Sequence, residues 1–208
     1  LYAAGGTACT GLHGAGLLPG NLVLDALTSG RAAGASAAAW LVDQAHGGSN
    51  AVAEAVEQAE ADVAAMMAPV ESEDGVVRIG SVTSSVSALI RNVFDGGTSG
   101  DELAAALETV ETLEVSAEAL HLDDRSLVAN ANFEAVLAAQ HGVQQARVML
   151  QSAMARTETR GVHVRHDHPD MDAEQMHHTL ISSDGTVDTL AVRKGVSGHW
   201  VLAPSESA

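Results

Sequence analysis

The chain has 208 residues, with 10 Lys and Arg against 27 Asp and Glu, and its formal net charge is −17. This charge excludes a broad binding surface for nucleic acid or anionic lipid, because phosphate groups would be repelled. Hydrophobic residues make up 46% and aromatic residues 2%, so global disorder is excluded and the core must be aliphatic, in one domain or in one domain with a small appendage.

Residues 1–20 are rich in glycine and other small residues, which predicts tight turns or a backbone that passes close to a ligand. Pro19-Gly20-Asn21 then signals the start of a helix that we expect to run to about Ala45. A second helix is predicted over residues 51–68, with acidic side chains on one face. Residues 69–80 are predicted to be a linker, with a short strand as one option.

Three further helices are predicted over residues 81–94, about 99–119 and about 126–156. Because short loops join them, we expect an antiparallel bundle over 81–156. The apolar residues expected on the buried side of the third helix are Val128, Phe133, Val136, Leu137, Val143, Val148 and Leu150.

The last part of the chain changes character. Residues 157–178 are dense in charge and histidine, and we expect them to be irregular. Residues 179–202 alternate around Asp184-Gly185, which predicts a β-hairpin. The whole chain is therefore predicted to be mainly α, with a glycine-rich strand-to-helix segment, a three-helix bundle and a C-terminal β-hairpin tail.

The chain has a single cysteine and no segment typical of a membrane span or a leader. The single cysteine, Cys9, excludes an intrachain disulfide and a multi-thiolate metal site within the chain, and it fits a reducing compartment. We find no run of about 18 apolar residues and no basic-then-apolar leader, so we expect neither a membrane span nor a signal segment. Because the chain begins at Leu1 inside an apolar run, we expect a processed subunit, a split subunit or a fragment of something larger.

The acidic composition has two interpretations. Lys194 is the only lysine, whereas Asp, Glu and Ala are abundant. Carboxylates hold water in concentrated salt, and salt screens their mutual repulsion, so the composition suits a salt-adapted protein. An ordinary soluble acidic protein with biased codon usage fits as well.

The glycine-rich entry into the first helix, from Gly14 to Asn21, is the first candidate site. A helix N-terminus offers unpaired N–H groups and a partial positive charge, and glycine lets a ligand approach that backbone closely. Phosphate, carboxylate and the edge of an electron-rich heterocycle are suitable ligands. The segment has no dinucleotide-binding or Walker spacing, so a plain strand–helix turn remains the alternative.

Histidines and aspartates crowd the region before the hairpin, and imidazole with carboxylate could hold a divalent metal. They are His163, His166, Asp167, His168, Asp170, Asp172, His177 and His178. No metal-ligand spacing such as HExxH occurs, so we expect solvated loop residues and no metal site.

Charges of both signs alternate from Arg156 through Glu158 and Arg160 to Arg165. Arginine forks bind carboxylates in a bidentate manner, so this stretch predicts an internal ion-pair web that fastens the tail to the bundle. Direct catalysis by these side chains is the alternative.

Two segments, in this order and at this separation, resemble one family. LYAAGGTACTGLHGAGLLPGNLVLDALTSGRAAG is similar to the C-terminal FAD-contacting segment of the succinate dehydrogenase, fumarate reductase and L-aspartate oxidase flavoproteins, and ARTETRGVHVRHDHPDMDAEQMHHTL is similar to the segment that follows their helical domain. The resemblance covers almost the whole chain. It implies four segments: 1–50 as the end of an FAD-binding domain, 51–80 as a connecting helix and linker, 81–156 as the helical bundle, and 157–208 as an irregular tail with the hairpin.

The resemblance implies that the cofactor is FAD, with its isoalloxazine edge near the helix start and its negative charge stabilised by backbone N–H groups. The residues implied to line that site are Gly5, Gly6, His13, Gly14, Gly20, Asn21, Leu22 and Val23. Relatives have Glu at Gly6, Arg at Leu17 and Ser at Leu22. Because that Arg holds a substrate carboxylate in relatives, succinate is not the expected substrate here.

The resemblance also implies partners. The dinucleotide-binding and capping domains of the family are absent from these residues, so we expect another chain or segment to supply them, with an iron–sulfur subunit as a further partner. We expect hydride transfer within such a complex, no activity from this chain alone, and a cytoplasmic location, peripheral at the inner face of the membrane. A non-catalytic docking subunit without flavin and a His/Asp metal module are the alternatives.

Overall fold

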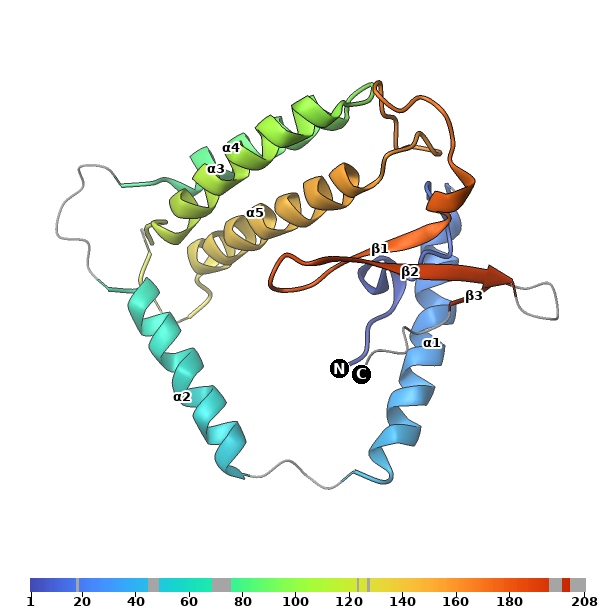
Figure 1. Ribbon diagram of the computed structural model, residues 1–208. Helices are drawn as coiled ribbons and strands as arrows, with labels where there is room; N and C mark the ends of the chain where they lie inside the picture. Colours follow the sequence, from blue (N-terminus) through green and yellow to red (C-terminus); the bar gives the residue numbers. More distant parts are fainter. Residues whose placement is uncertain are drawn as a thin grey trace. The chain divides into compact units, whose positions relative to one another are not determined.

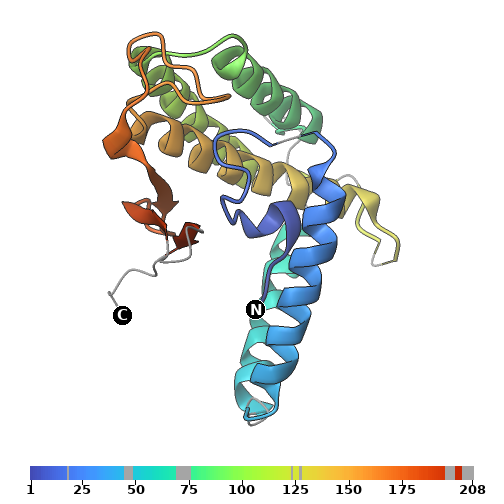
Figure 2. The same cartoon turned by 90° about the vertical axis from the view of Figure 1, so that its right-hand side faces the viewer.

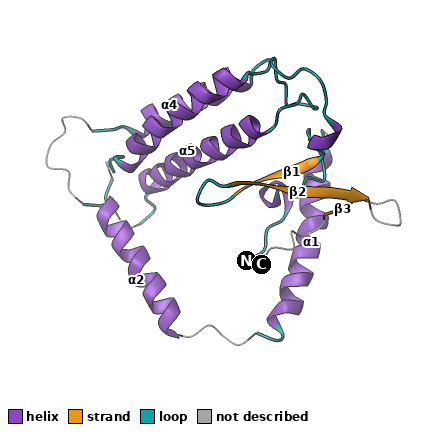
Figure 3. Cartoon of the chain, viewed as in Figure 1, coloured by secondary structure: helices purple, strands orange, loops and turns teal. Residues whose placement is uncertain are grey.

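The computed structural model describes residues 1–17, 19–44, 49–68, 76–122, 124–126, 128–194 and 200–202. It divides into two compact units, Leu1–Val63 and Ala64–Ala208, each of which has its own arrangement of elements. Helices dominate the described residues (Figure 3), and the mainly α class predicted from the sequence is confirmed.

In the first unit, a short 3-10 helix η1 (Gly5–Ala8) precedes the long helix α1 (Asn21–Leu41). Figure 2 shows the glycine-rich segment folded back along α1, which η1 contacts directly. The predicted helix start at Asn21 is confirmed, and α1 ends four residues before the predicted end at Ala45, which lies outside the described residues.

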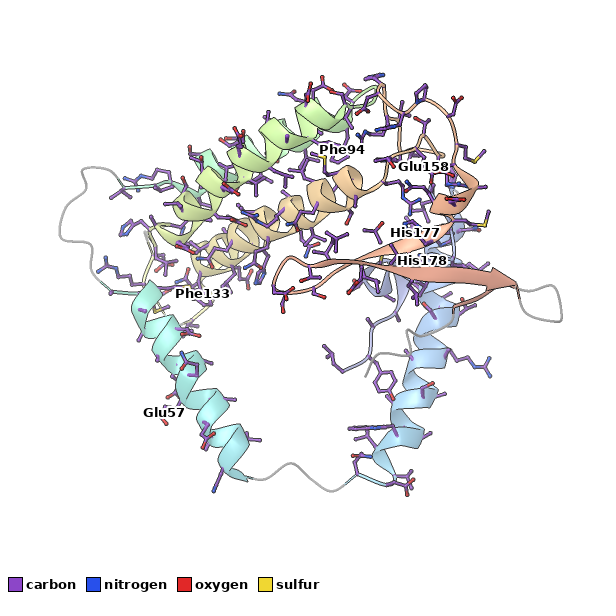
Figure 4. The ribbon with its side chains drawn as sticks, viewed as in Figure 1. Glu57, Phe94, Phe133, Glu158, His177 and His178 are labelled. Atoms are coloured by element: carbon purple, nitrogen blue, oxygen red, sulfur yellow. The ribbon has the colours of Figure 1, made fainter. Side chains whose placement is uncertain are left out.

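Helix α2 (Ser49–Met66) begins in the first unit and crosses the boundary between the two. Its acidic side chains are exposed, as Glu57 illustrates in Figure 4. Gln58 Nε2 donates to Asp62 Oδ1 at 2.8 Å, one turn further along the helix. Such i, i+4 pairs stabilise an exposed helix only slightly.

The described part of Leu1–Val63 has almost no apolar core. Gly5 and Asp25 are its only buried residues. Large apolar side chains on α1 are instead exposed: Leu22, Val23, Leu24, Leu27, Trp40 and Leu41. Helix propensity alone does not stabilise a helix that exposes so many apolar side chains to water. We therefore expect these side chains to pack against another part of a protein.

The second unit contains the predicted bundle. Helices α3 (Ile79–Phe94), α4 (Gly100–Glu118) and α5 (Ala131–Ala155) run antiparallel in turn, and α4 makes its most extensive contact with α5 (Figure 1). The buried residues of α5 recur every three or four positions and alternate large with small: Val136, Ala139, Val143, Ala146, Leu150 and Ala153. Leu103, Ala106, Val110 and Ala117 form the matching stripe on α4. The alanines let the two helices approach closely.

Two of the residues expected on the buried side of the third helix are exposed. Val128 is 82% exposed because α5 begins only at Ala131. Val148 is 38% exposed because it lies off the stripe that Val143, Ala146 and Leu150 define.

Side chains cap two of the three bundle helices, α4 and α5, whereas α3 has no side-chain cap. Ser99 and Glu102 form a capping box on α4, and Ser99 N donates to Glu102 Oε2 at 2.8 Å. Asn130 Oδ1 accepts a hydrogen bond from Phe133 N at 2.8 Å at the start of α5. These caps satisfy backbone donors that the helix itself leaves unpaired.

The tail forms a small antiparallel sheet that packs on α5. A 3-10 turn (Ala173–Gln175) leads into β1 (His177–Ile181), which pairs with β2 (Val187–Lys194), and β2 pairs with β3 (Trp200–Leu202). The predicted hairpin is confirmed, and its turn is closed by Gly185 at φ 83° and by Asp184 Oδ1, which accepts from Thr186 N at 2.9 Å.

The linker predicted over 69–80 is described only from residue 76 onward. Val77 forms a single parallel bridge with Leu120, which is less than the short strand considered from the sequence. Residues 69–75 lie outside the described residues. In the described ranges, no helix combines the length and the apolar character that a membrane span requires.

Candidate functional site

The candidate site is the glycine-rich segment together with the first turn of α1. Gly14 (φ 62°) and Gly20 (φ 86°) have left-handed backbone conformations, and a Cβ added at either would meet nothing within 4 Å. Glycine is therefore required at both positions by the backbone conformation and not by crowding. The space beside both residues is open to a ligand.

The N-terminus of α1 has no side-chain cap. Its N-cap is Gly20, and no side chain accepts a hydrogen bond there; α3 also has no side-chain cap, whereas α4 and α5 do. Leu22 and Val23, in the first turn, are 54% and 70% exposed, and Asn21 is half-buried. The free N–H groups and the partial positive charge of this terminus suit an anion or an electron-rich ring edge.

Gly5 and Gly6 lie in η1 and differ in what surrounds them. Gly5 is buried, and a Cβ added to it would lie 3.5 Å from the Cα and Cβ of Ala26. Its N–H donates to Ser29 Oγ at 2.8 Å. Gly6 is exposed, with nothing within 4 Å of an added Cβ. Gly5 thus packs η1 on the second turn of α1, whereas Gly6 leaves open space.

His13 lies in the loop between η1 and α1 and contacts a residue that the sequence analysis did not single out. Its Nε2 is 3.3 Å from Asp25 Oδ2, and the two side chains are 18% and 7% exposed. Asp25 is the single acidic residue within the apolar run Leu22–Leu27. This interruption of the run is the sequence signal by which Asp25 could have been singled out. Gly20, Asn21, Leu22 and Val23 are adjacent, and His13 is joined to the same helix through Asp25.

A second polar cluster, the ion-pair web around Glu158, lies in the other unit just beyond α5 (Figure 4). Glu158 is fully buried and accepts from Arg156 Nη1 at 2.6 Å, from Arg160 Nε at 2.7 Å and from the backbone N of Asp172 at 2.8 Å. These contacts, the Arg160 hydrogen bond above all, lower the pKa of Glu158 to about 2. Arg156 also donates to the carbonyl of His177 at 2.6 Å, which fastens β1.

Arg165 and Asp167 extend this web to the ends of two helices. Arg165 is 2% exposed and donates to Asp167 Oδ1 and to the carbonyl of Ala153, near the end of α5. Asp167 Oδ2 accepts from the backbone N of Gly100, the first residue of α4, at 2.9 Å. Arg165 holds the pKa of Asp167 well below its usual range. The predicted ion-pair web is therefore present, and its contacts are structural.

The histidines of the tail that the structure describes do not form a ligand set. In the part of the chain that the structure describes, no group of three or more His, Cys, Asp or Glu side chains could hold a metal ion. His163 Nε2 lies 3.2 Å from the carbonyl of Arg156, and burial lowers its pKa. His168 lies beside Asp167 at 3.8 Å, and His177 contributes its backbone carbonyl to Arg156.

Comparison with known proteins identifies the class. Residues 96–204 match the family model described as the C-terminal part of the fumarate reductase flavoprotein. This chain belongs to that family, as the two sequence segments predicted.

The relatives have the same region as part of longer proteins. The fumarate reductase flavoprotein subunit of Mycobacterium tuberculosis (strain H37Rv) is 30% identical over 193 residues, which cover 90% of this chain and 33% of that protein. The L-aspartate oxidase of Rhodospirillum rubrum is 31% identical over 183 residues, which cover 85% and 52%. This chain spans about a third of the length of the fumarate reductase and succinate dehydrogenase relatives that it matches.

Solved structures agree on the fold. A chain of the Escherichia coli quinol fumarate reductase matches with a TM-score of 0.78 at 22% identity, over 90% of this chain and 32% of that one. A chain of the Mycobacterium smegmatis Sdh1 complex matches with a TM-score of 0.74 at 22% identity, over 97% and 32%.

Proposed function

We propose that residues 1–50 complete an FAD site whose remaining walls come from another chain or segment, within an FAD-dependent oxidoreductase. The observation that carries this proposal is the first turn of α1. It combines a left-handed glycine cap and an uncapped N-terminus with exposed apolar side chains at Leu22 and Val23. A helix start of this kind is incomplete by itself, and a flat, electron-rich, partly apolar ligand suits both its charge and its surface.

The residues present fit a flavin. Backbone N–H groups of Asn21, Leu22 and Val23 would donate to the electron-rich edge of the ring and stabilise its negative charge. Gly6 and Gly14 would admit the ligand, because no Cβ occupies the space beside them. When bound, FAD supplies the hydride chemistry, and this chain binds and orients it.

The substrate is proposed to differ from plain succinate. Leu17, which is 48% exposed, stands where the resemblance implies a carboxylate-binding Arg, and residues 1–30 contain neither Lys nor Arg. A dicarboxylate therefore has no bidentate partner in this segment. A monocarboxylate, an amino acid or a more apolar substrate fits better.

Leu17→Arg tests the choice of substrate. The variant is expected to lower the KM of the assembled enzyme for succinate or fumarate at least tenfold. The proposal fails if the unmodified enzyme oxidises succinate at rates that Leu17→Ala leaves unchanged while no other cation contacts the substrate.

The partners follow from what this segment lacks. We propose a chain or segment with the dinucleotide-binding and capping domains, together with an iron–sulfur subunit, in an assembly held peripherally at the inner face of the membrane. The chain or segment with the dinucleotide-binding and capping domains would cover the exposed apolar row of α1, which consists of Leu22, Val23, Leu24, Leu27, Trp40 and Leu41. Crosslinking from residues 1–30 in the native assembly would identify that neighbour.

A docking subunit without flavin is the second candidate function. It is favoured by three residues that depart from the pattern of the flavoproteins, Gly6, Leu17 and Leu22. The visible absorbance of the purified, partner-bound protein separates the two functions. Flavin bands support the oxidoreductase, and a colourless assembly that is complete in its partners supports docking.

A further inference from the structure

Asp25 is an unusual residue to bury in this unit. It is 7% exposed, and no other side chain in the described part of Leu1–Val63 is buried. The long apolar side chains around it on α1 remain exposed. Because an ionised carboxylate is strongly disfavoured in a buried position without a partner, packing does not explain its place.

The partner of Asp25 is His13, at 3.3 Å between Nε2 and Oδ2. A carboxylate accepts hydrogen bonds, so Nε2 of His13 carries the hydrogen, and the lone pair of the neutral ring is then on Nδ1. In the described residues Nδ1 has no hydrogen-bond partner. Nε2 of His13 is thus hydrogen-bonded to Asp25, and Nδ1 is available to accept a hydrogen bond from a ligand.

Ser29 makes a second connection one turn further along α1. Ser29 Oγ accepts from Gly5 N at 2.8 Å and donates to the backbone carbonyl of Asp25 at 2.5 Å. Asp25 and Ser29 therefore hold the glycine-rich segment at two places, the loop through His13 and η1 through Gly5. The two connections are chemically independent, since one uses the side chain of Asp25 and the other its backbone.

We propose that Asp25 is the positioning residue of the site: it holds His13 by Nε2 and so presents Nδ1 as an acceptor to an N–H or O–H group of the flavin nucleotide at the start of α1. This inference rests on the proposed function, because it needs the flavin as the ligand. The arrangement follows a general pattern in which a carboxylate sets the tautomer and orientation of a histidine that binds a ligand through its other nitrogen.

The test is a double-mutant cycle on flavin affinity in the assembled flavoprotein, read by the quenching of flavin fluorescence. Asp25→Asn and His13→Gln should each raise the Kd for FAD about tenfold, the effect of one lost hydrogen bond to the ligand. The double variant should raise it no further, because both changes remove the same contact. Glu57→Gln, on exposed α2, is the matched charge control and should leave the Kd unchanged.

Ser29→Ala separates positioning from simple support of the fold. It removes the contact with Gly5 and leaves His13 and the Asp25 carboxylate in place, so its effect on the Kd should add to that of His13→Gln. If Asp25→Asn does not fold, Asp25→Glu retains the carboxylate and should bind FAD within about threefold of the unmodified protein.

Each possible result either supports or overturns the positioning role of Asp25. Additive effects of Asp25→Asn and His13→Gln, or an unchanged Kd in Asp25→Asn, would overturn the positioning role while leaving the proposed function intact. An unmodified assembly that binds no flavin would overturn both. A rise of about tenfold or more in the Kd of Asp25→Glu would also overturn the positioning role, since the retained carboxylate would then not matter.

Discussion

Removing the Glu158 carboxylate should destabilise the unit Ala64–Ala208 strongly. Glu158 is fully buried, and its two guanidinium partners, Arg156 and Arg160, are only 16% and 24% exposed. Breaking a buried pair by deleting one partner typically costs about 3–5 kcal/mol, because the remaining charge is left uncompensated. Since the arginines here retain some contact with water, we expect about 3 kcal/mol for Glu158→Gln. In a unit of this size that corresponds to a fall in Tm of roughly 6–12 °C.

The assay is thermal unfolding followed by circular dichroism, with Glu114→Gln as the matched control. Glu114 pairs with Arg147 across α4 and α5, but the two side chains are 32% and 29% exposed. A pair of that kind is worth about 0–1 kcal/mol. Equal losses of Tm in the two variants would refute the argument that burial makes Glu158 special.

The dependence on pH gives a second readout of the same prediction. Because folding lowers the pKa of Glu158 from 4.5 to about 2, its contribution is complete above pH 4.5. It is lost as the pH falls from 4.5 to about 2. This part of the acid destabilisation should be absent in Glu158→Gln, and an unchanged acid profile would contradict the assignment.

Three further predictions concern two glycines and added salt. Gly97→Ala should destabilise the bundle unit by more than about 1 kcal/mol in denaturant titrations, because φ is 109° and the new Cβ would lie 2.8 Å from Val164 Cγ1. Gly142→Ala, inside α5 with open space around it, should stabilise by about 0.5–1 kcal/mol, and a loss there would contradict the helix-propensity argument. With a net charge of −17, the Tm should rise as KCl is added to molar levels, and a flat response would refute the salt-adapted interpretation.

Local signals explain the parts of the structure that the sequence predicted. Gly20 and Asn21 mark the start of α1, and Asp184-Gly185 marks the hairpin turn, because each depends on neighbours within a few residues. The ion-pair web was predictable for the same reason, since Arg156 and Arg160 are each two residues from Glu158.

Contacts between distant residues were not predictable. Asp167 caps α4 at Gly100, 67 positions away, and nothing near either residue indicates the pairing. Asp25 and His13 are 12 positions apart, and an acidic residue on an apolar helix fits a solvent-facing position equally well. The alanine stripe of α5 was missed because hydrophobic patterns favour large side chains, whereas close helix packing selects small ones.

A structure of the native assembly in its oxidised state tests the central claim most directly. The account predicts a flavin ring whose edge accepts hydrogen bonds, at about 3 Å, from backbone N–H groups among Asn21, Leu22 and Val23. It also predicts that a neighbouring chain or segment covers the exposed apolar row of α1. A complete assembly in which that helix start is covered by protein side chains alone, with no flavin beside it, would contradict the account.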